Sequence, residues 1–173
     1  QAVELAKLSL LLKVLENETK ESVNQQLKLF QERALPNLDN NIRCGNSVVD
    51  SSYFKQATLV QNHEELSRIN PFDWDDKQKG FGNILTEGGF DIVIGNPPYV
   101  KEDVSREIFD AVRKTNLRKY SQGKMDFWQF FTCQAIDLLK EGGLHIYISQ
   151  IRCITIAGSS ILRNKVLNYS KLL

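Results

Sequence analysis

The chain has 173 residues, of which 42% are hydrophobic and 25% charged, and its net charge is +1. These values are typical of one soluble globular domain and exclude a fibrous, strongly acidic or strongly basic chain. No apolar run approaches the roughly 20 residues of a membrane helix, and the first residues lack a signal-peptide cleavage pattern, so we expect a cytoplasmic protein. Three cysteines without a CxxC pair predict neither a disulfide framework nor a zinc site.

The first third of the chain predicts two helices and a short strand. Residues 1–18 carry leucines and a valine close to helical spacing. A second helix is expected over 22–34, because Pro36 closes off the polar stretch that contains it. Residues 41–46 read as a short strand that ends in a turn at Gly45 and Asn46.

The middle of the chain predicts a long connection and a buried strand. Residues 47–89 carry weak helical patterns and the text INPFDW at 69–74, and we interpret them as a connection or a family-specific insertion. Residues 90–95, FDIVIG, form an almost continuous apolar run, which is typical of a strand covered on both faces.

The last third alternates between helix and strand. We expect helices over 105–114, 126–140 and 159–167, with Gly142 stopping the second of them, and a strand over 144–149. This alternation predicts an α/β fold with a parallel sheet and flanking helices.

The tetrapeptide Asn96-Pro97-Pro98-Tyr99 follows the apolar strand at the edge where open parallel sheets bind ligands. The asparagine side chain offers a carbonyl acceptor, and the two prolines carry no N–H groups to compete with their carbonyls. Such an array of acceptors suits a planar amino group, and a tyrosine gives a face on which a base can stack. A base in a duplex reaches such a pocket only when it is flipped out. The alternative is a plain strand-to-loop turn.

A run of basic residues follows the loop. Between Ala111 and Lys124 there is no acidic residue, and the basic ones are Arg113, Lys114, Arg118, Lys119 and Lys124. They form a candidate phosphate-binding patch for double-stranded DNA, while the alternative is a solvated surface. No pattern predicts a metal site, because His63 and His145 are isolated and the aspartates at 73, 75 and 76 match no catalytic spacing.

The text FDIVIGNPPYV resembles motif IV of the amino-group DNA methyltransferases that act on adenine N6. The segments NIRCGNSVVD, INPFDW and GKMDFWQFFTCQAIDLLKEGGLHIYIS agree with it. The set is most similar to the methylase portion of type II restriction–modification enzymes in which cleavage and methylation can share one polypeptide. The resemblance implies a partial Rossmann-like fold, with residues 1–173 forming one partial domain.

The resemblance implies roles for six residues. Asn96 and Pro97 would accept hydrogen bonds from the adenine amino group, and Tyr99 would stack on the extruded base. Pro98 would lie near the methyl donor, S-adenosylmethionine. Asn46 and Phe131 would contact the adenine of this cofactor, although Phe131 fits a core position equally well.

The chain departs from the family pattern in lacking the glycine-rich loop and the acidic ribose ligand. We therefore expect an internal fragment without the first strands of the sheet, which binds the cofactor weakly. Two other functions remain open. One is methylation of glutamine side chains of release factors or of ribosomal components, and the other is a non-catalytic nucleic-acid-binding module.

Overall fold

The computed structural model describes residues 2–16, 19, 37–55, 63–123, 125–149 and 158–171. The chain forms two compact units, Gln1–Cys44 and Gly45–Leu173. The helix expected at 22–34 lies outside the described residues. Among the described residues, every helix is too short or too polar to cross a membrane.

The first unit contains helix α1, Ala2–Leu15, which confirms the helix expected from the leucine spacing. Lys7 on this helix forms ion pairs with Glu4 at 3.4 Å and with Asp39 at 2.8 Å. The second pair ties the helix to the segment that leads out of the unit. Leu5, Leu8 and Leu12 on the same helix are exposed.

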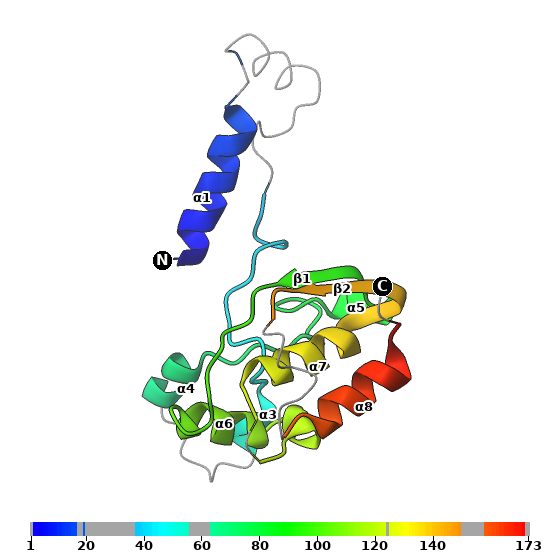
Figure 1. Cartoon of the computed structure of the whole chain (residues 1–173). Helices are drawn as coiled ribbons and strands as arrows, with labels where there is room; N and C mark the ends of the chain where they lie inside the picture. Colours follow the sequence, from blue (N-terminus) through cyan, green and yellow to red (C-terminus); the bar gives the residue numbers. More distant parts are fainter. Residues whose placement is uncertain are drawn as a thin grey trace. The chain divides into compact units, whose positions relative to one another are not determined.

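The second unit is an α/β structure built on a two-stranded parallel sheet (Figure 1). The two strands are β1, Phe90–Gly95, and β2, Leu139–Tyr147. The helices are α3 (Ser52–Lys55), α4 (His63–Ile69), α5 (Gly82–Thr86), α6 (Arg106–Arg113), the 3-10 helix η1 (Asn116–Tyr120), α7 (Trp128–Leu138) and α8 (Ser160–Tyr169). The parallel sheet, β1 and the last three α-helices confirm the α/β prediction.

The register of the sheet places the carboxyl ends of β1 and β2 side by side. Ile92 pairs with Leu144, Ile94 with Ile146, and Gly95 with Tyr147. The strands run in the same direction because α7 carries the chain back between them, as expected for a βαβ unit. Both following loops therefore emerge at one edge of the sheet.

The two faces of the sheet differ in their cover. Helices α3, α4, α6, α7 and α8 lie on one side of the strands (Figure 1), where Val93 and His145 are partly buried. The opposite face, which we call the outer face, carries five exposed aliphatic side chains, Ile92, Ile94, Leu144, Ile146 and Ile148. The expectation that β1 is covered on both faces is therefore wrong for the described part of the chain.

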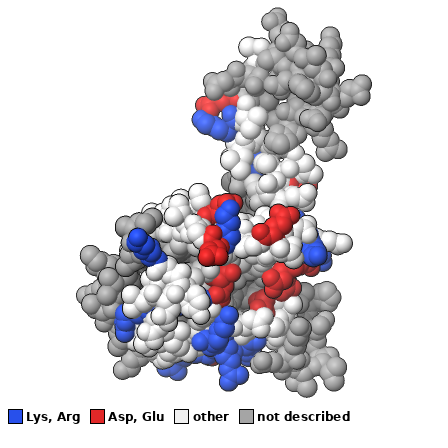
Figure 2. All heavy atoms as spheres, turned by 90° about the vertical axis from the view of Figure 1, so that its right-hand side faces the viewer, with Lys and Arg blue, Asp and Glu red and all other residues white. Residues whose placement is uncertain are grey.

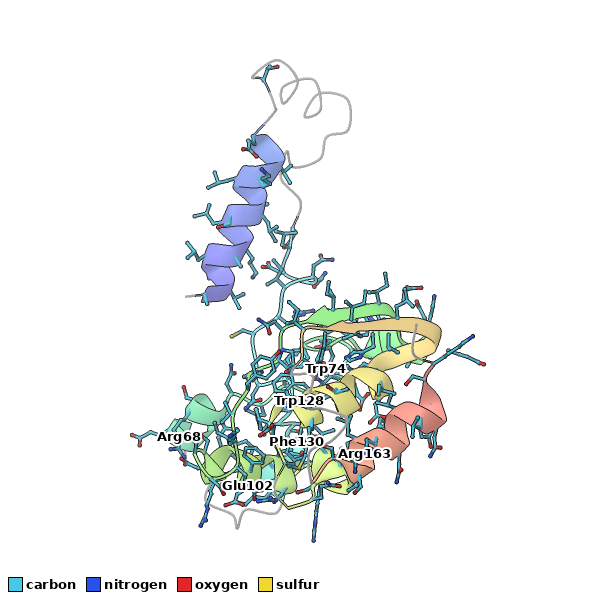
Figure 3. The ribbon with its side chains drawn as sticks, viewed as in Figure 1. Arg68, Trp74, Glu102, Trp128, Phe130 and Arg163 are labelled. Carbon is cyan, nitrogen blue, oxygen red and sulfur yellow. The ribbon has the colours of Figure 1, made fainter. Side chains whose placement is uncertain are left out.

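The main core lies among α3, α6, η1 and the start of α7. It joins Val48, Val49 and Tyr53 from the long connection to Phe109 of α6 and to Phe127 and Phe130 at the start of α7. Phe130 of α7 belongs to this core, whereas Trp128 of the same helix packs with Cys133 and Leu162 in a second cluster (Figure 3). Burying aromatic side chains of this size contributes about 1.5–3 kcal/mol for each fully buried ring.

Two local predictions were wrong. Residues 41–45 form no strand, and Asn46 makes only a single bridge with Pro71. Helix α7 ends at Leu138 rather than at Gly142, because Leu139 already has extended geometry and pairs with Phe90. Gly89 permits this close approach, since it has a φ of +112° and an added Cβ would lie 2.6 Å from the Leu138 carbonyl oxygen.

Candidate active site

The tetrapeptide Asn96–Tyr99 leaves β1 at the carboxyl edge of the sheet. Pro97 is buried, whereas Asn96, Pro98 and Tyr99 are exposed. No side-chain partner of Asn96 occurs among the described residues, so its amide oxygen is available at the surface. The Pro97 ring therefore forms the buried base of the loop, whereas the Asn96 amide and the Tyr99 ring face outward.

The tyrosine of the loop reaches the end of the neighbouring strand. The Tyr99 hydroxyl donates a hydrogen bond to the backbone carbonyl of Ile148, which directly follows β2. The side chain of Tyr99 is still 41% exposed. Its ring is thus presented at the edge of the sheet and is not inserted into the core.

The exit of the loop is fixed to the start of α7. The Val100 carbonyl accepts a hydrogen bond from the Phe127 amide at 2.8 Å, and Lys101 forms an antiparallel bridge with Asp126. Val100 also packs against the main core. Strand β1 and helix α7 therefore hold the tetrapeptide at both ends.

Asn46 lies at a turn and is partly buried. Its backbone amide donates to the Asn70 carbonyl at 2.6 Å, and its side-chain oxygen accepts a long hydrogen bond from the Val48 amide at 3.4 Å. Next to it, an added Cβ on Gly45 would lie 2.6 Å from Phe72. The turn is therefore closely packed. Because the hydrogen bond from Val48 is long, the side-chain amide of Asn46 can still bind another partner.

Residues 69–74, INPFDW, stabilise the turn at Asn46. The Phe72 amide donates to the Val49 carbonyl at 2.8 Å, and the Trp74 indole donates to the Ser47 carbonyl at 2.8 Å. The Ser51 amide donates to the Asp73 carboxylate at 2.7 Å. The segment therefore docks on residues 47–51.

Phe131 lies on α7 at the border of the main core. It is partly buried and makes an edge contact with Phe127, with 5.5 Å between the ring centroids. Val48, which follows Asn46 closely in the sequence, and Phe127, which lies one helical turn before Phe131, belong to the same core. The structure therefore brings these two segments together. Part of the Phe131 ring remains accessible.

The two basic residues at the carboxyl end of α6, Arg113 and Lys114, have internal partners. Arg113 forms an ion pair with Glu102, a second with Asp110 at 3.1 Å, and a hydrogen bond to Ser121 at 3.0 Å. Glu102 is the main reason that the pKa of the guanidinium is raised. Lys114 lies over the ring of Tyr53, with its ammonium 4.9 Å from the centroid. Arg113 is therefore committed to the protein itself, while Lys114 keeps an exposed side chain.

The basic residues on η1 are more exposed. Arg118 is exposed and has no ionic partner among the described residues, whereas Lys119 lies 3.4 Å from Asp137. Lys124 lies outside the described residues. Figure 2 shows acidic and basic side chains interspersed on the face that it presents. The basic residues expected to form one patch therefore differ: Arg113 and Lys119 have ionic partners, whereas Arg118 has none among the described residues.

The 3-10 helix is held by a polar cluster that sequence analysis did not predict. Lys165 of α8 donates to Asp137 of α7 and, at 2.7 Å, to the Tyr120 hydroxyl, which itself donates to Asp137 at 2.6 Å. Burial would raise the pKa of Asp137, but the hydrogen bonds from Lys165 and Tyr120 outweigh it and lower this pKa. Tyr120, Asp137 and Lys165 are far apart in sequence, so no local pattern could have grouped them.

Buried Cys133 lies beside this cluster. Burial raises the pKa of its thiol to about 12, so the thiol stays protonated at neutral pH. A protonated thiol is a poor nucleophile. Cys133 is therefore a core side chain.

A protein-family model described as Eco57I restriction-modification methylase matches residues 1–173. The chain belongs to this family. This Eco57I-family chain is 34% identical over 166 residues to the type II restriction enzyme and methyltransferase RM.Eco57I of Escherichia coli, covering 95% of the chain and 14% of that relative. It is also 31% identical over 80 residues to a putative type II restriction enzyme and methyltransferase of Methanocaldococcus jannaschii, covering 46% of the chain and 6% of that relative.

Proposed function

We propose that the Eco57I-family chain contributes the target-amine site of a DNA methyltransferase that modifies adenine at N6 within a restriction–modification system. The observation that carries this proposal is the exposed Asn96 side chain at the carboxyl end of β1, which has no partner among the described residues and lies next to two prolines and an exposed tyrosine ring. We further propose a cytoplasmic enzyme, with double-stranded DNA as its partner.

The loop is suited to bind an amino group through both of its hydrogens. The Asn96 side-chain oxygen and the Pro97 carbonyl oxygen are acceptors, and neither proline has an N–H that would compete. Two acceptors orient the N6 nitrogen and stabilise the positive charge that grows on it during alkylation. Holding the nitrogen in line with the methyl group lowers the barrier without a covalent enzyme intermediate.

Tyr99 supplies the second part of the site. Its exposed ring gives a base a stacking surface, and base–aromatic stacking is worth about 1–3 kcal/mol. A flipped adenine could thus place its ring on Tyr99 while its amino group contacts Asn96 and Pro97. This arrangement offsets part of the cost of extracting the base from the duplex.

The described residues fit one end of S-adenosylmethionine. The Asn46 amide has only a weak intramolecular bond, and Phe131 keeps part of its ring accessible beside the same core. An amide and an aromatic face suit the adenine moiety of the cofactor, and Pro98 would border the methyl group. The cofactor supplies the methyl group when it is bound.

DNA would contact the basic residues on the surface of α6 and η1. Exposed Arg118 is the strongest candidate for a phosphate contact, followed by Lys114 and Lys119, while Lys124 is proposed from its sequence position alone. Arg113 is the weakest candidate, because Glu102 and Asp110 already neutralise it. Phosphate contacts of this kind weaken as salt rises.

Methylation of a protein glutamine would use the same loop, since a glutamine amide carries the same NH2 group. Membership of the restriction-modification methylase family supports DNA over this substrate. The same membership supports an enzyme over a non-catalytic nucleic-acid-binding module.

The test is the methyl-transfer rate of the intact protein with radiolabelled S-adenosylmethionine and unmethylated bacteriophage DNA. Replacing Asn96 by Ala removes one of two acceptors, and we expect kcat to fall by about a hundredfold or more. Asn83→Ala is the matched control, because Asn83 is an exposed asparagine on α5. Equal rates for Asn96→Ala and the wild type would refute the proposed site.

A further inference from the structure

The backbone of one residue, Ile148, contacts both the residue before the tetrapeptide Asn96–Tyr99 and the last residue of the tetrapeptide. Its amide donates to the carbonyl of Gly95, immediately before Asn96, at 3.3 Å. Its carbonyl accepts the hydroxyl of Tyr99, the last residue of the tetrapeptide. The loop is therefore closed like a clasp on a single residue that directly follows β2.

The clasp depends on the register of the sheet. Gly95 pairs with Tyr147, so the next residue along β2 comes level with the start of the tetrapeptide. An added Cβ on Gly95 would lie 3.0 Å from the Tyr147 ring, so a larger residue at this position would require that ring to shift. The end of β2 thus sits where it can hold the tyrosine.

The hydrogen bond fixes how the Tyr99 ring is presented. A tyrosine on the surface rotates about two side-chain bonds, and a bond at the far end of the ring restricts both rotations. The bond also uses the hydroxyl proton, so the ring offers its face to a ligand and not a competing donor. Asn96 and Pro97 then remain the polar groups that meet an amino group.

We propose that Ile148 is a positioning residue for methyl transfer, which acts through its backbone by holding Tyr99 in the orientation that aligns the target base. This inference rests on the proposed function and deepens it. The ring of Tyr99 contacts the base, whereas Ile148 acts only through Tyr99. Losing the tether leaves the stacking surface in place but lets the base adopt unproductive angles, so kcat suffers more than binding does.

The test is Tyr99→Phe in the intact protein, which removes one oxygen atom and keeps the ring. We expect kcat on unmethylated bacteriophage DNA to fall about threefold to tenfold, in line with the loss of one neutral hydrogen bond, while KM for DNA changes less than twofold. Hydrogen exchange should become faster in peptides that cover residues 96–101. Tyr169→Phe is the matched control, because Tyr169 is 75% exposed on α8 and distant in sequence from the loop.

Each outcome distinguishes the inference from the function on which it rests. If the wild type methylates adenine and Tyr99→Phe keeps a kcat within twofold of it, the positioning role of Ile148 is wrong and the proposed function stands. If exchange in the loop rises but kcat does not change, the bond is only structural and the inference is again wrong. If the wild type transfers no methyl group to adenine, the proposed function itself fails.

Discussion

Tyr99 and Asn96 could be proposed as site residues from the sequence because their chemistry is local. Two prolines after an apolar strand mark a donor-poor loop, and the strand bounds of 90–95 match the structure. Ile148 gave no such signal, since it acts through backbone atoms that every residue has. Its role follows from the register of the sheet, which the sequence alone does not specify.

Asn46 and Phe131 show what a residue pattern can predict about a site and what it cannot. The structure places the segment after Asn46 and the aromatic residues around Phe131 in one core, but the docking of Phe72 and Trp74 that holds the turn depends on contacts distant in sequence. The residues were predictable, and the scaffold around them was not. Their contact with a cofactor stays a prediction.

His145 gives a pH prediction at the residue scale. It faces the covered side of β2, burial lowers its pKa, and its Nε2 atom is buried without a partner among the described residues. The unfolded chain therefore binds a proton more readily than the folded one as the pH falls below the ordinary histidine value of about 6.5. Folding stability should decrease below this pH, by at most about 1.4 kcal/mol per pH unit from this group.

Urea unfolding between pH 7 and pH 5 measures this effect. In His145→Leu the contribution disappears, so the stability curve should be flatter than that of the wild type across this range. Parallel curves for the two proteins would show that His145 does not titrate differently in the folded and unfolded states.

At the scale of elements, the sequence pattern predicted which segments form helices and which form strands. It did not predict where these elements end or which parts of the chain pack on them. The sequence predicted a helix over 126–140, but the end of α7 depends on the pairing of Leu139 with Phe90. The strand expected at 41–46 failed because a short segment forms a strand only where a partner edge is available, and here only Asn46 meets Pro71.

The contact between α7, α8 and η1 gives an element-scale prediction. Lys165 is 9% exposed and its partner Asp137 is 35% exposed, so Lys165→Met leaves a half-shielded carboxylate with fewer partners. We expect the free energy of unfolding to fall by about 1–2 kcal/mol, less than for a fully buried pair because solvent still reaches Asp137. Urea unfolding at pH 7 measures it.

Lys140→Met is the matched control for this prediction. Lys140 pairs with Asp91 on the surface, with side chains 45% and 75% exposed, and exposed pairs contribute little. A change of less than about 0.5 kcal/mol is expected for it. Equal losses for the two variants would mean that the Lys165 cluster is no stronger than a surface pair.

At the scale of the whole molecule, the outer face of the sheet is the main departure from expectation. Parallel sheets are usually covered on both faces, yet Ile94 on this face is 75% exposed. An apolar face of this kind binds hydrophobic dyes and favours self-association. The apolar composition of β1 predicted cover on both faces, and in the described part of the chain this is wrong for the outer face.

This face gives a prediction for the 173-residue chain. Ile94 and Ile146 pair in register, so Ile94→Lys with Ile146→Glu places opposite charges side by side on the outer face. We expect the fluorescence of the dye ANS in the presence of the protein to fall severalfold. Val104→Lys with Leu167→Glu is the control, since both residues are exposed but lie away from the sheet. Equal fluorescence in the two double variants would contradict the prediction.

The central claim is that the loop after β1 holds the amino group of adenine in DNA. Mass spectrometry of nucleosides from unmethylated bacteriophage DNA, treated with the intact protein and S-adenosylmethionine, tests it most directly. The account predicts N6-methyladenine as the modified nucleoside, in an amount that Asn96→Ala abolishes. Methylation of another base, or unchanged DNA beside a methylated protein, would contradict it.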